Sequence, residues 1–290
     1  MKVVFLGTGA SRPTKERGVS SIAVKYRGEV ILFDCGENAQ RQMVSLIKPS
    51  KITSIFISHF HGDHVLGIPG LLMTMSLSER TEPLDIYGPE KTIYFLKNML
   101  KSGYFGINFD VNVHEIEDGG RVNFGEYYIQ SFKTDHGVPS LGYIFKENDR
   151  RGSFIEEKTE KLGINGKMFS KLERNGEITV NGKNVTMEEL TGPKKTGKSI
   201  IYTGDTLPVD IPFKKCDLLI HESTFLNEKD RNNTFHSTVK DACEAARDIG
   251  AKKLILTHIS QRYDPGEIEK KAREYIDSAE VAEDLAVIEL

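Results

Sequence analysis

The sequence has few cysteines and no long apolar run. Its three cysteines, Cys35, Cys216 and Cys243, are odd in number and include no CxxC pair. This pattern argues against a disulfide framework and a zinc ribbon. It is typical of a reducing compartment, so we expect a cytoplasmic protein. No apolar stretch approaches the roughly 18 residues of a membrane span, and we expect no membrane partner.

The sequence also lacks a strong excess of either charge. Its 39 basic and 42 acidic residues leave a net charge of −3, so the chain as a whole is not a polycation. Apolar residues make up 38% and charged residues 28%, a composition that excludes wholesale disorder. The first ten residues contain one lysine and a short apolar stretch broken by Gly7 and Gly9. They read as a strand entering a loop rather than as a signal peptide.

Apolar runs and amphipathic segments alternate along both halves of the chain. Short runs rich in β-branched and aromatic residues predict strands at 3–6, 21–24, 30–33, 51–58, 127–132, 199–203, 217–221 and 253–257. Helical periodicity predicts helices at 68–78, 94–100, 238–249 and 267–279, the third capped by Ser237 or Thr238. Two strand-rich halves with outer helices predict an α/β fold in which two sheets pack face to face between helical layers.

The segment between the halves has a different character. Residues 146–198 carry 12 lysines and arginines against 9 acidic residues, an excess of three positive charges. Their apolar residues are mostly isolated, so we expect them to pack poorly as a core. Two interpretations stay open: a solvated insertion, or an arm that binds a polyanion.

One cluster of metal-ligating residue types dominates the sequence. His59, His61, Asp63 and His64 follow directly after a buried strand, at the edge of a sheet where α/β proteins bind ligands. In an extended turn His59 and His61 point the same way and can hold one ion, while Asp63 and His64 can face a second. Imidazole and carboxylate are ligands that Zn²⁺ and its neighbours prefer.

Three further residues of the same kinds follow predicted strands. They are His136, Asp205 and His258, each one or two residues past an apolar run. Because such strand ends meet at one sheet edge, we expect these side chains to converge on the first cluster. Of the remaining histidines, His114 reads as an exposed strand residue and His221 as a structural or supporting residue.

The complete pattern resembles the metallo-β-lactamase superfamily, whose HxHxDH motif is followed by later His, Asp and His ligands. Within it the chain is similar to the ribonuclease Z family of tRNA 3′-processing endonucleases. The segments that carry this resemblance are 235–238 (an HST loop), 219–225, 257–263 and 11–18 (a PxKxRN-like loop with Gly18 in place of Asn). The resemblance implies one αβ/βα four-layer sandwich over 1–290, with a protruding flexible arm inserted at 150–197.

The resemblance also implies site residues and partners. His59, His61 and His136 would hold one Zn²⁺, Asp63, His64 and His258 a second, and Asp205 would bridge them, with Mn²⁺ or another divalent ion as a substitute. Asp34 would support the metal loop, and Asp63, His236 and Glu222 would act in catalysis. The residues implied to bind precursor tRNA are Pro13, Lys15, Arg17, Lys167 and Lys171. A homodimer is implied too.

Other functions fit parts of the pattern. A generic phosphodiesterase of this superfamily, acting on small diesters, would carry the same metal ligands. A di-iron flavoprotein of the superfamily is disfavoured because such proteins carry Glu where His61 stands. A catalytically inactive RNA-binding protein would not need every ligand intact. Gly7-Thr8-Gly9 lacks the third glycine of a dinucleotide loop, so we expect no nucleotide cofactor.

Overall fold

The computed structural model describes residues 1–232 and 234–290. Contacts between Cα atoms divide the chain into a larger unit, residues 1–146 and 199–290, and a smaller unit, residues 147–198. Among the residues described, no helix has both the length and the apolar character needed to cross a membrane.

Two seven-stranded sheets form the centre of the larger unit. The first has the order β16-β1-β2-β3-β4-β5-β6, and its strands are β1 (Lys2–Gly7), β2 (Ser21–Tyr26), β3 (Glu29–Phe33), β4 (Ile52–Phe56), β5 (Leu84–Gly88), β6 (Val111–Glu115) and β16 (Val287–Glu289). The second has the order β15-β14-β13-β12-β9-β8-β7, and its strands are β7 (Arg121–Asn123), β8 (Tyr127–Lys133), β9 (Leu141–Glu147), β12 (Ser199–Tyr202), β13 (Leu218–Glu222), β14 (Leu254–Thr257) and β15 (Glu280–Val281). Strands β3 to β6 are parallel, as are β12 to β15.

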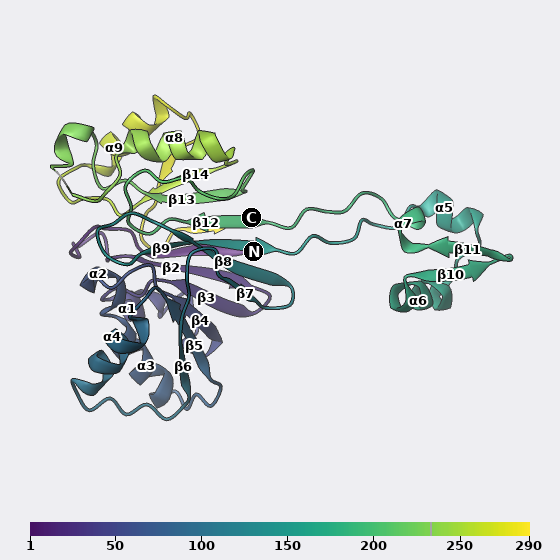
Figure 1. Ribbon diagram of the computed structural model, residues 1–290, viewed down its shortest axis with the longest axis horizontal. Helices are drawn as coiled ribbons and strands as arrows, with labels where there is room; N and C mark the ends of the chain where they lie inside the picture. The colour runs from purple at the N-terminus through teal and green to yellow at the C-terminus, as the bar shows by residue number, and fades with distance from the viewer. Residues whose placement is uncertain (233) are drawn as a thin grey trace. The chain divides into compact units, whose positions relative to one another are not determined.

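Helices cover the two outer faces of the paired sheets (Figure 1). On the first sheet lie α1 (Ala39–Met43), η1 (Pro49–Lys51), α2 (Gly62–Val65), α3 (Ile68–Leu77) and α4 (Thr92–Lys101). Near the second sheet lie η2 (Glu228–Asp230), α8 (Val239–Ile249) and α9 (Pro265–Arg273). The predicted metallo-β-lactamase-type sandwich of four layers is therefore confirmed.

The core between the sheets is rich in aromatic side chains. Phe33, Phe56 and Tyr143 are fully buried there. The rings of Phe33 and Tyr143 stack at 5.8 Å between centroids, and Phe56 stacks on Tyr87 at 4.7 Å. Tyr143 also donates a hydrogen bond to the carbonyl of Ile57, 2.6 Å away, beside the loop that carries the metal-ligand motif. This packing ties that loop to the rigid centre of the unit.

Helix ends follow local capping chemistry. Thr238 caps α8: its hydroxyl accepts the N–H of Asp241, and the Asp241 carboxylate accepts the N–H of Thr238. Helix α9 starts at Pro265 behind its cap Asp264 and ends at Arg273, earlier than the predicted 279. On α4, Leu96 is buried and Ile93 is 49% exposed.

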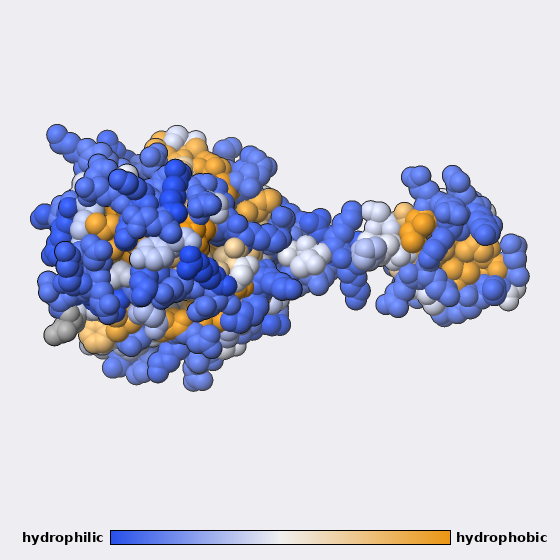
Figure 2. All heavy atoms as spheres, turned by 90° about the horizontal axis from the view of Figure 1, so that it is seen from above, coloured by the Kyte–Doolittle hydropathy of each residue, from blue (hydrophilic) through white to orange (hydrophobic). Residues whose placement is uncertain are grey.

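The smaller unit has its own apolar core, contrary to the expectation of isolated apolar residues. It contains α5 (Glu156–Lys161), α6 (Gly166–Asn175), the hairpin β10 (Glu177–Val180) and β11 (Lys183–Thr186), and α7 (Met187–Leu190). Residues that are separate in the sequence meet because Leu172 of α6 packs on the inward side chains Ile178, Val180 and Val185 of the hairpin. Figure 2 shows apolar side chains of this unit bordered by hydrophilic ones.

Candidate metal centre

Strand ends carry most of the predicted ligands. His59 follows β4, His136 follows β8, Asp205 follows β12 and His258 follows β14. His61 is the N-cap of the short helix α2, which places Asp63 and His64 in its first turn. The structure brings these residues together in one pocket of the larger unit, with five of them almost fully buried.

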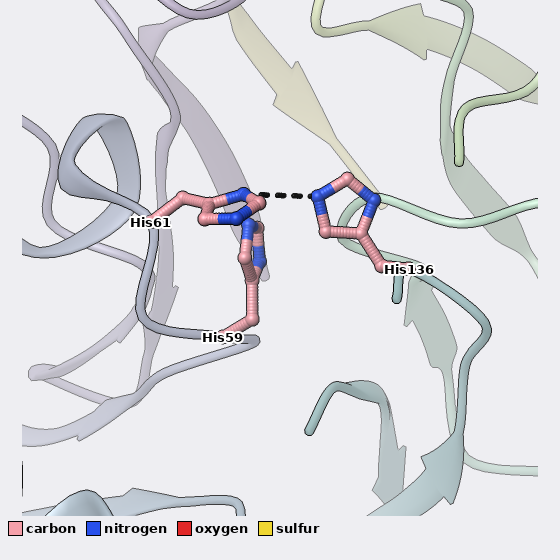
Figure 3. Close-up of side chains that lie close together, drawn as sticks. All are labelled: His59, His61 and His136. Atoms are coloured by element: carbon pink, nitrogen blue, oxygen red, sulfur yellow. Dashed lines mark hydrogen bonds between the residues drawn. The ribbon is translucent and has the colours of Figure 1, made fainter. Parts of the chain in front are cut away.

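Three imidazoles form the first half of the pocket (Figure 3). Nε2 of His136 lies 3.0 Å from Nδ1 of His61. The ring of His59 lies 4.6 Å from that of His61 and 4.5 Å from that of His136, between centroids. One donor atom from each of the three can therefore reach a common ion.

Asp63, His64 and His258 form the second half. Oδ2 of Asp63 lies 3.4 Å from Nε2 of His258 and 3.7 Å from Nε2 of His64. These residues come from α2 and from the loop after β14, at opposite ends of the chain.

Asp205 lies between the two halves. Its Oδ2 is 3.7 and 3.9 Å from Nε2 of His136 and His59, and 3.3 and 3.2 Å from Nε2 of His64 and His258. One carboxylate oxygen thus faces histidines of both triads, which is the position that a bridging ligand requires.

The donor set fits divalent metal. Tetrahedral ligands with bonds of about 2.0–2.1 Å lie about 3.3 Å from one another, close to the spacings around Asp205. Among the residues described, Nε2 of His59, Nε2 of His64 and Oδ1 of Asp205 are buried without a hydrogen-bond partner. Buried polar atoms seldom lack a partner, so these atoms point to an ion.

The second nitrogen of each buried histidine is held by a hydrogen bond. Nδ1 of His136 donates to the carbonyl of Phe235 at 2.6 Å, and Nδ1 of His64 donates to Oδ2 of Asp34 at 2.7 Å. These bonds fix the tautomer that leaves Nε2 bare for a metal.

Two hydroxyl groups extend this support. Ser58 donates to Oδ2 of Asp34 at 2.7 Å and lies 3.0 Å from Nδ1 of His59. Thr224 donates to Oε2 of Glu222 at 2.7 Å and lies 2.8 Å from Nδ1 of His258. The sequence pattern assigned no role to either hydroxyl, although Ser58 directly precedes His59 and Thr224 lies within the segment 219–225.

Asp34 is fully buried beneath the pocket. It accepts hydrogen bonds from the backbone and side chain of Ser58, from His64 and from the hydroxyl of Tyr202 at 2.7 Å. Its backbone has a φ of 58°, a left-handed conformation that Asp tolerates better than most residues. The structure thus places Asp34 behind the metal loop.

Electrostatics favour bound cations. Burial would raise the pKa of Asp205, but His258 and His64 outweigh burial and hold it well below its ordinary value. Burial lowers the pKa of His59 well below 6.5, which keeps the ring neutral and available as a ligand. Burial lowers the pKa of His64 as well, but the charges of Asp205 and Asp34 outweigh burial and raise it well above 6.5. The pocket therefore pairs an ionised carboxylate with one neutral and one cationic imidazole, and a bound cation would replace the proton on Nε2 of His64.

A glycine makes room for Asp205. Gly204, next to Asp205, has a φ of 61°, and a Cβ there would lie 2.7 Å from Cβ of Ser58. Only glycine lets the chain turn this close to the metal loop.

His236 and Glu222 form a pair beside the second triad. Oε1 of Glu222 lies 3.0 Å from Nδ1 of His236, and the ring of His236 stacks on that of His258 at 5.2 Å. Burial lowers the pKa of His236, but the hydrogen bond to Glu222 and its charge raise it to about 9. The imidazole is therefore protonated at neutral pH.

The loop that follows β1 reaches the same pocket. The N–H of Ser11 donates to Oδ2 of Asp63 at 2.9 Å. Pro13 and Lys15 are exposed on this loop. Arg17 turns away from solvent, because its guanidinium donates to Oγ1 of Thr8 at 2.5 Å and to the carbonyl of Ala282 at 2.6 Å.

Other predicted residues lie outside the pocket. Lys167 and Lys171 are exposed on α6 of the smaller unit. His114 is 44% exposed on β6, with Nε2 3.2 Å from Oδ1 of Asp85. His221 is buried in β13, where its Nδ1 donates to the carbonyl of Glu222 at 2.7 Å.

Comparisons with known proteins agree with this geometry. Residues 1–155 match the family model of the anti-Pycsar protein Apyc1, and residues 185–259 match that of the beta-lactamase superfamily domain. The chain is 50% identical to the ribonuclease Z of Thermococcus kodakarensis over 91% of this chain and 85% of that protein. It is also 50% identical to the ribonuclease Z of Pyrococcus horikoshii, over 94% and 90% of the two chains.

A solved structure extends the likeness to three dimensions. The short form of human tRNase Z (ELAC1) superimposes with a TM-score of 0.72 at 28% identity, over 100% of this chain and 99% of that one. The 50% sequence identity to these two relatives extends over nearly the whole chain, and together with the metal pocket it shows to which family the chain belongs. The chain belongs to the ribonuclease Z family, metal-dependent hydrolases with the metallo-β-lactamase fold.

Proposed function

We propose that the protein is an endoribonuclease that removes the 3′ trailer from precursor tRNA. The cut would leave a 3′-hydroxyl on the tRNA and a 5′-phosphate on the trailer. The observation that carries this proposal is the place of Asp205, whose Oδ2 lies within 3.2–3.9 Å of Nε2 of four histidines. That arrangement occurs in a chain about half identical to proteins named ribonuclease Z.

We infer that the pocket holds two zinc ions, and that Mn²⁺ or another divalent ion can replace them. His59, His61 and His136 would bind the first ion, Asp63, His64 and His258 the second, and Asp205 both. When bound, the ions supply Lewis acidity toward the phosphoryl oxygens and lower the pKa of water.

His236 is suited to act as the general acid. Its Nδ1 is engaged by Glu222, so its Nε2–H is the group left to face the substrate. As the P–O3′ bond breaks, this proton would pass to the leaving 3′ oxygen, and the bond between the attacking water oxygen and phosphorus would form on the opposite side. A pKa of about 9 keeps the proton in place at neutral pH.

Asp63 is suited to orient or deprotonate the attacking water. Its Oδ2 is fixed by the N–H of Ser11 and lies 3.4 Å from His258. Burial would raise its pKa, but the hydrogen bond to His258 and the nearby histidines hold the pKa well below its ordinary value. The carboxylate is therefore ionised at neutral pH and can accept a hydrogen bond from the water, whereas its lowered pKa makes it a weak base, which favours the orienting role.

Pro13 and Lys15 are proposed to contact the 3′ end of the tRNA, because their exposed loop is tied to Asp63 through Ser11. Arg17 would contribute by holding this loop in place rather than by touching RNA, since its guanidinium is bonded to Thr8 and Ala282. This interpretation changes the role that the sequence predicts for Arg17.

Lys167 and Lys171 are proposed to bind the phosphate backbone of the tRNA. They lie four residues apart on α6, and Arg174 follows three residues later, so the three cations share one helix face. The buried Leu172 marks the opposite, inward face. A row of cations on an exposed face is better suited to binding RNA, which carries many phosphates, than to binding a small diester, which carries one.

We also propose a homodimer. Val44 and Leu77 are each 83% exposed, and Leu66 is 54% exposed. They lie at the C-terminal ends of α1, α2 and α3, and a contiguous patch of such exposed apolar side chains would be typical of a protein interface. Sedimentation at micromolar concentration should give twice the chain mass, and Val44→Asp with Leu77→Asp should give monomers.

The decisive experiment is cleavage of an end-labelled precursor tRNA, mapped to the nucleotide, with and without chelator. We expect one cut at the 3′ side of the mature tRNA, abolished by chelator. A small diester such as bis-p-nitrophenyl phosphate is assayed in parallel. Hydrolysis of the diester without cleavage of the precursor would favour the generic phosphodiesterase instead.

A further inference from the structure

An apolar cavity of about 160 Å³ opens beside the metal pocket. It is lined by the apolar side chains of Phe60, Phe95, Val138 and Pro139, by His61, and by the ion pair of Glu90 and Lys91. The cavity therefore shares His61 with the first metal triad, and Figure 3 shows this ring turned toward His136. No role described above accounts for its aromatic side chains.

Two phenyl rings form one wall of the cavity. Phe60 stacks on Phe95 at 4.9 Å between centroids, with an angle of 27° between the rings. Phe95 is 40% exposed on α4, and Val138 on the facing loop is 40% exposed as well. Large apolar groups left accessible at the edge of a polar site are typical of ligand contacts.

The surroundings restrict which ligand fits. A neighbouring cavity contacts the pocket through His236 and contains Arg12 and Arg262, so it suits phosphate groups. The hollow behind Val138 contains the acidic residues Glu115 and Glu117, which repel phosphate. The aromatic cavity is thus suited to an uncharged, planar group attached to a chain that crosses the metals.

We propose that the cavity lined by Phe60 and Phe95 binds a nucleobase adjacent to the scissile phosphate of the RNA substrate by stacking. This inference rests on the proposed function. When the scissile phosphate lies at the metals, the two flanking nucleotides lie next to it, within reach of the cavity that begins at His61. Lys91, 59% exposed, lines the same cavity with its Nζ 3.9 Å from Oε1 of Glu90. Stacking accepts every base, so the site would add affinity with little sequence preference.

Phe95 is the residue to vary, because Phe60 lies between two metal ligands. Phe95→Ala should lower kcat/KM for precursor tRNA about tenfold, within the range expected for loss of one stacked base. Phe95→Tyr should stay within about threefold of the parent. Tyr94→Ala is the matched control: Tyr94 is 62% exposed on the same helix and does not line the cavity, so activity should hold. Tyr94→Ala should also leave hydrolysis of bis-p-nitrophenyl phosphate unchanged.

Abasic substrates identify the nucleotide. Two substrates are compared, one lacking the base on the 5′ side of the cut and one lacking the base on the 3′ side. The parent protein should cleave one of the two more slowly, and on that substrate Phe95→Ala should reduce kcat/KM no further. An equal loss for Phe95→Ala on all substrates, or no loss on any, would overturn the inference. So would a change of oligomeric mass that accounts for the loss. If the parent protein fails to cleave precursor tRNA at all, it is the proposed function that fails.

Discussion

The hydroxyl of Thr224 donates a hydrogen bond to Oε2 of Glu222 at 2.7 Å. The same hydroxyl lies 2.8 Å from Nδ1 of His258, so it connects the carboxylate to an imidazole of the proposed metal site. Ser58 connects Asp34 to His59 in the same way. Asp34 and Glu222 therefore each orient one histidine directly, His64 and His236, and a second one through a hydroxyl group.

Thr224→Val removes the connecting hydroxyl and keeps the shape of the side chain. We expect its zinc affinity to fall about 10- to 100-fold, the usual effect of losing a hydrogen bond behind a metal ligand. Thr224→Ser retains the hydroxyl and should stay close to the parent. Competition with a chromogenic chelator measures the affinity. Equal affinity in the Val and Ser variants would show that the hydroxyl does not orient His258.

His236→Ala removes the proposed proton donor. We expect kcat for precursor tRNA to fall about 10²- to 10⁴-fold, as is usual for loss of a general acid, with bound zinc unchanged. Glu222→Gln should have a smaller effect in the same direction, because the imidazole stays but its pKa falls. His114→Ala, on the exposed strand β6, is the matched control and should retain full activity. Unchanged turnover by His236→Ala at saturating precursor would exclude the proposed role.

Asp284 anchors the loop that carries Ser11. Its carboxylate accepts hydrogen bonds from the N–H of Gly18 at 2.6 Å, from Thr8 at 2.7 Å and from Gln42 at 2.9 Å. Asp284→Ala leaves these donors without their partner, so we expect the free energy of unfolding to fall by about 1–3 kcal/mol. The kcat/KM for precursor tRNA should fall more than that for a small diester.

Glu283→Ala is the control for this effect, because Glu283 is the exposed neighbour of Asp284. Denaturant unfolding and steady-state kinetics of the two variants give both quantities. If Asp284→Ala loses stability and keeps its kcat/KM for precursor tRNA, the contact of the loop with Asp63 is irrelevant to cleavage.

Leu172→Ala tests the smaller unit. Leu172 is fully buried in the core of that unit, so its truncation should destabilise the unit by about 2–5 kcal/mol. We expect weaker binding of precursor tRNA and unchanged hydrolysis of the small diester. Lys167→Glu with Lys171→Glu should weaken RNA binding to a similar extent without destabilising the unit, because both side chains are exposed.

Filter retention measures the affinity for precursor tRNA, and hydrogen exchange of residues 147–198 measures the stability of the smaller unit. Together they separate the loss of RNA contacts from the loss of stability. Full affinity for precursor tRNA in the charge-reversal variant would remove these lysines from the RNA-binding surface. Loss of diester hydrolysis in Leu172→Ala would instead show that the smaller unit supports the fold of the larger one.

The candidate metal ligands were accessible to sequence reasoning because they are either contiguous or placed at strand ends. His59 to His64 lie within one turn, and His136, Asp205 and His258 each follow a strand whose apolar run is easy to see. The four-layer fold followed from the same runs. Ser11 and Asp284 were not found, because their contacts with Asp63 and Gly18 depend on how distant segments pack.

The core of the smaller unit was missed for a related reason. Leu172 and Val185 are surrounded in the sequence by charged and polar residues, and neither belongs to an apolar run. Their contact arises when α6 folds back on the hairpin of β10 and β11, so it is a property of tertiary structure. Similarly, the half-buried position of Arg17 follows from its bond to Ala282, 265 residues away.

The most direct test is the zinc content of the purified protein combined with anomalous scattering at the zinc edge. We expect two ions per chain, one bonded to His59, His61 and His136, the other to Asp63, His64 and His258, and both bonded to Asp205. A protein that cleaves precursor tRNA with a single ion, or with ions bound away from Asp205, would contradict the dinuclear site.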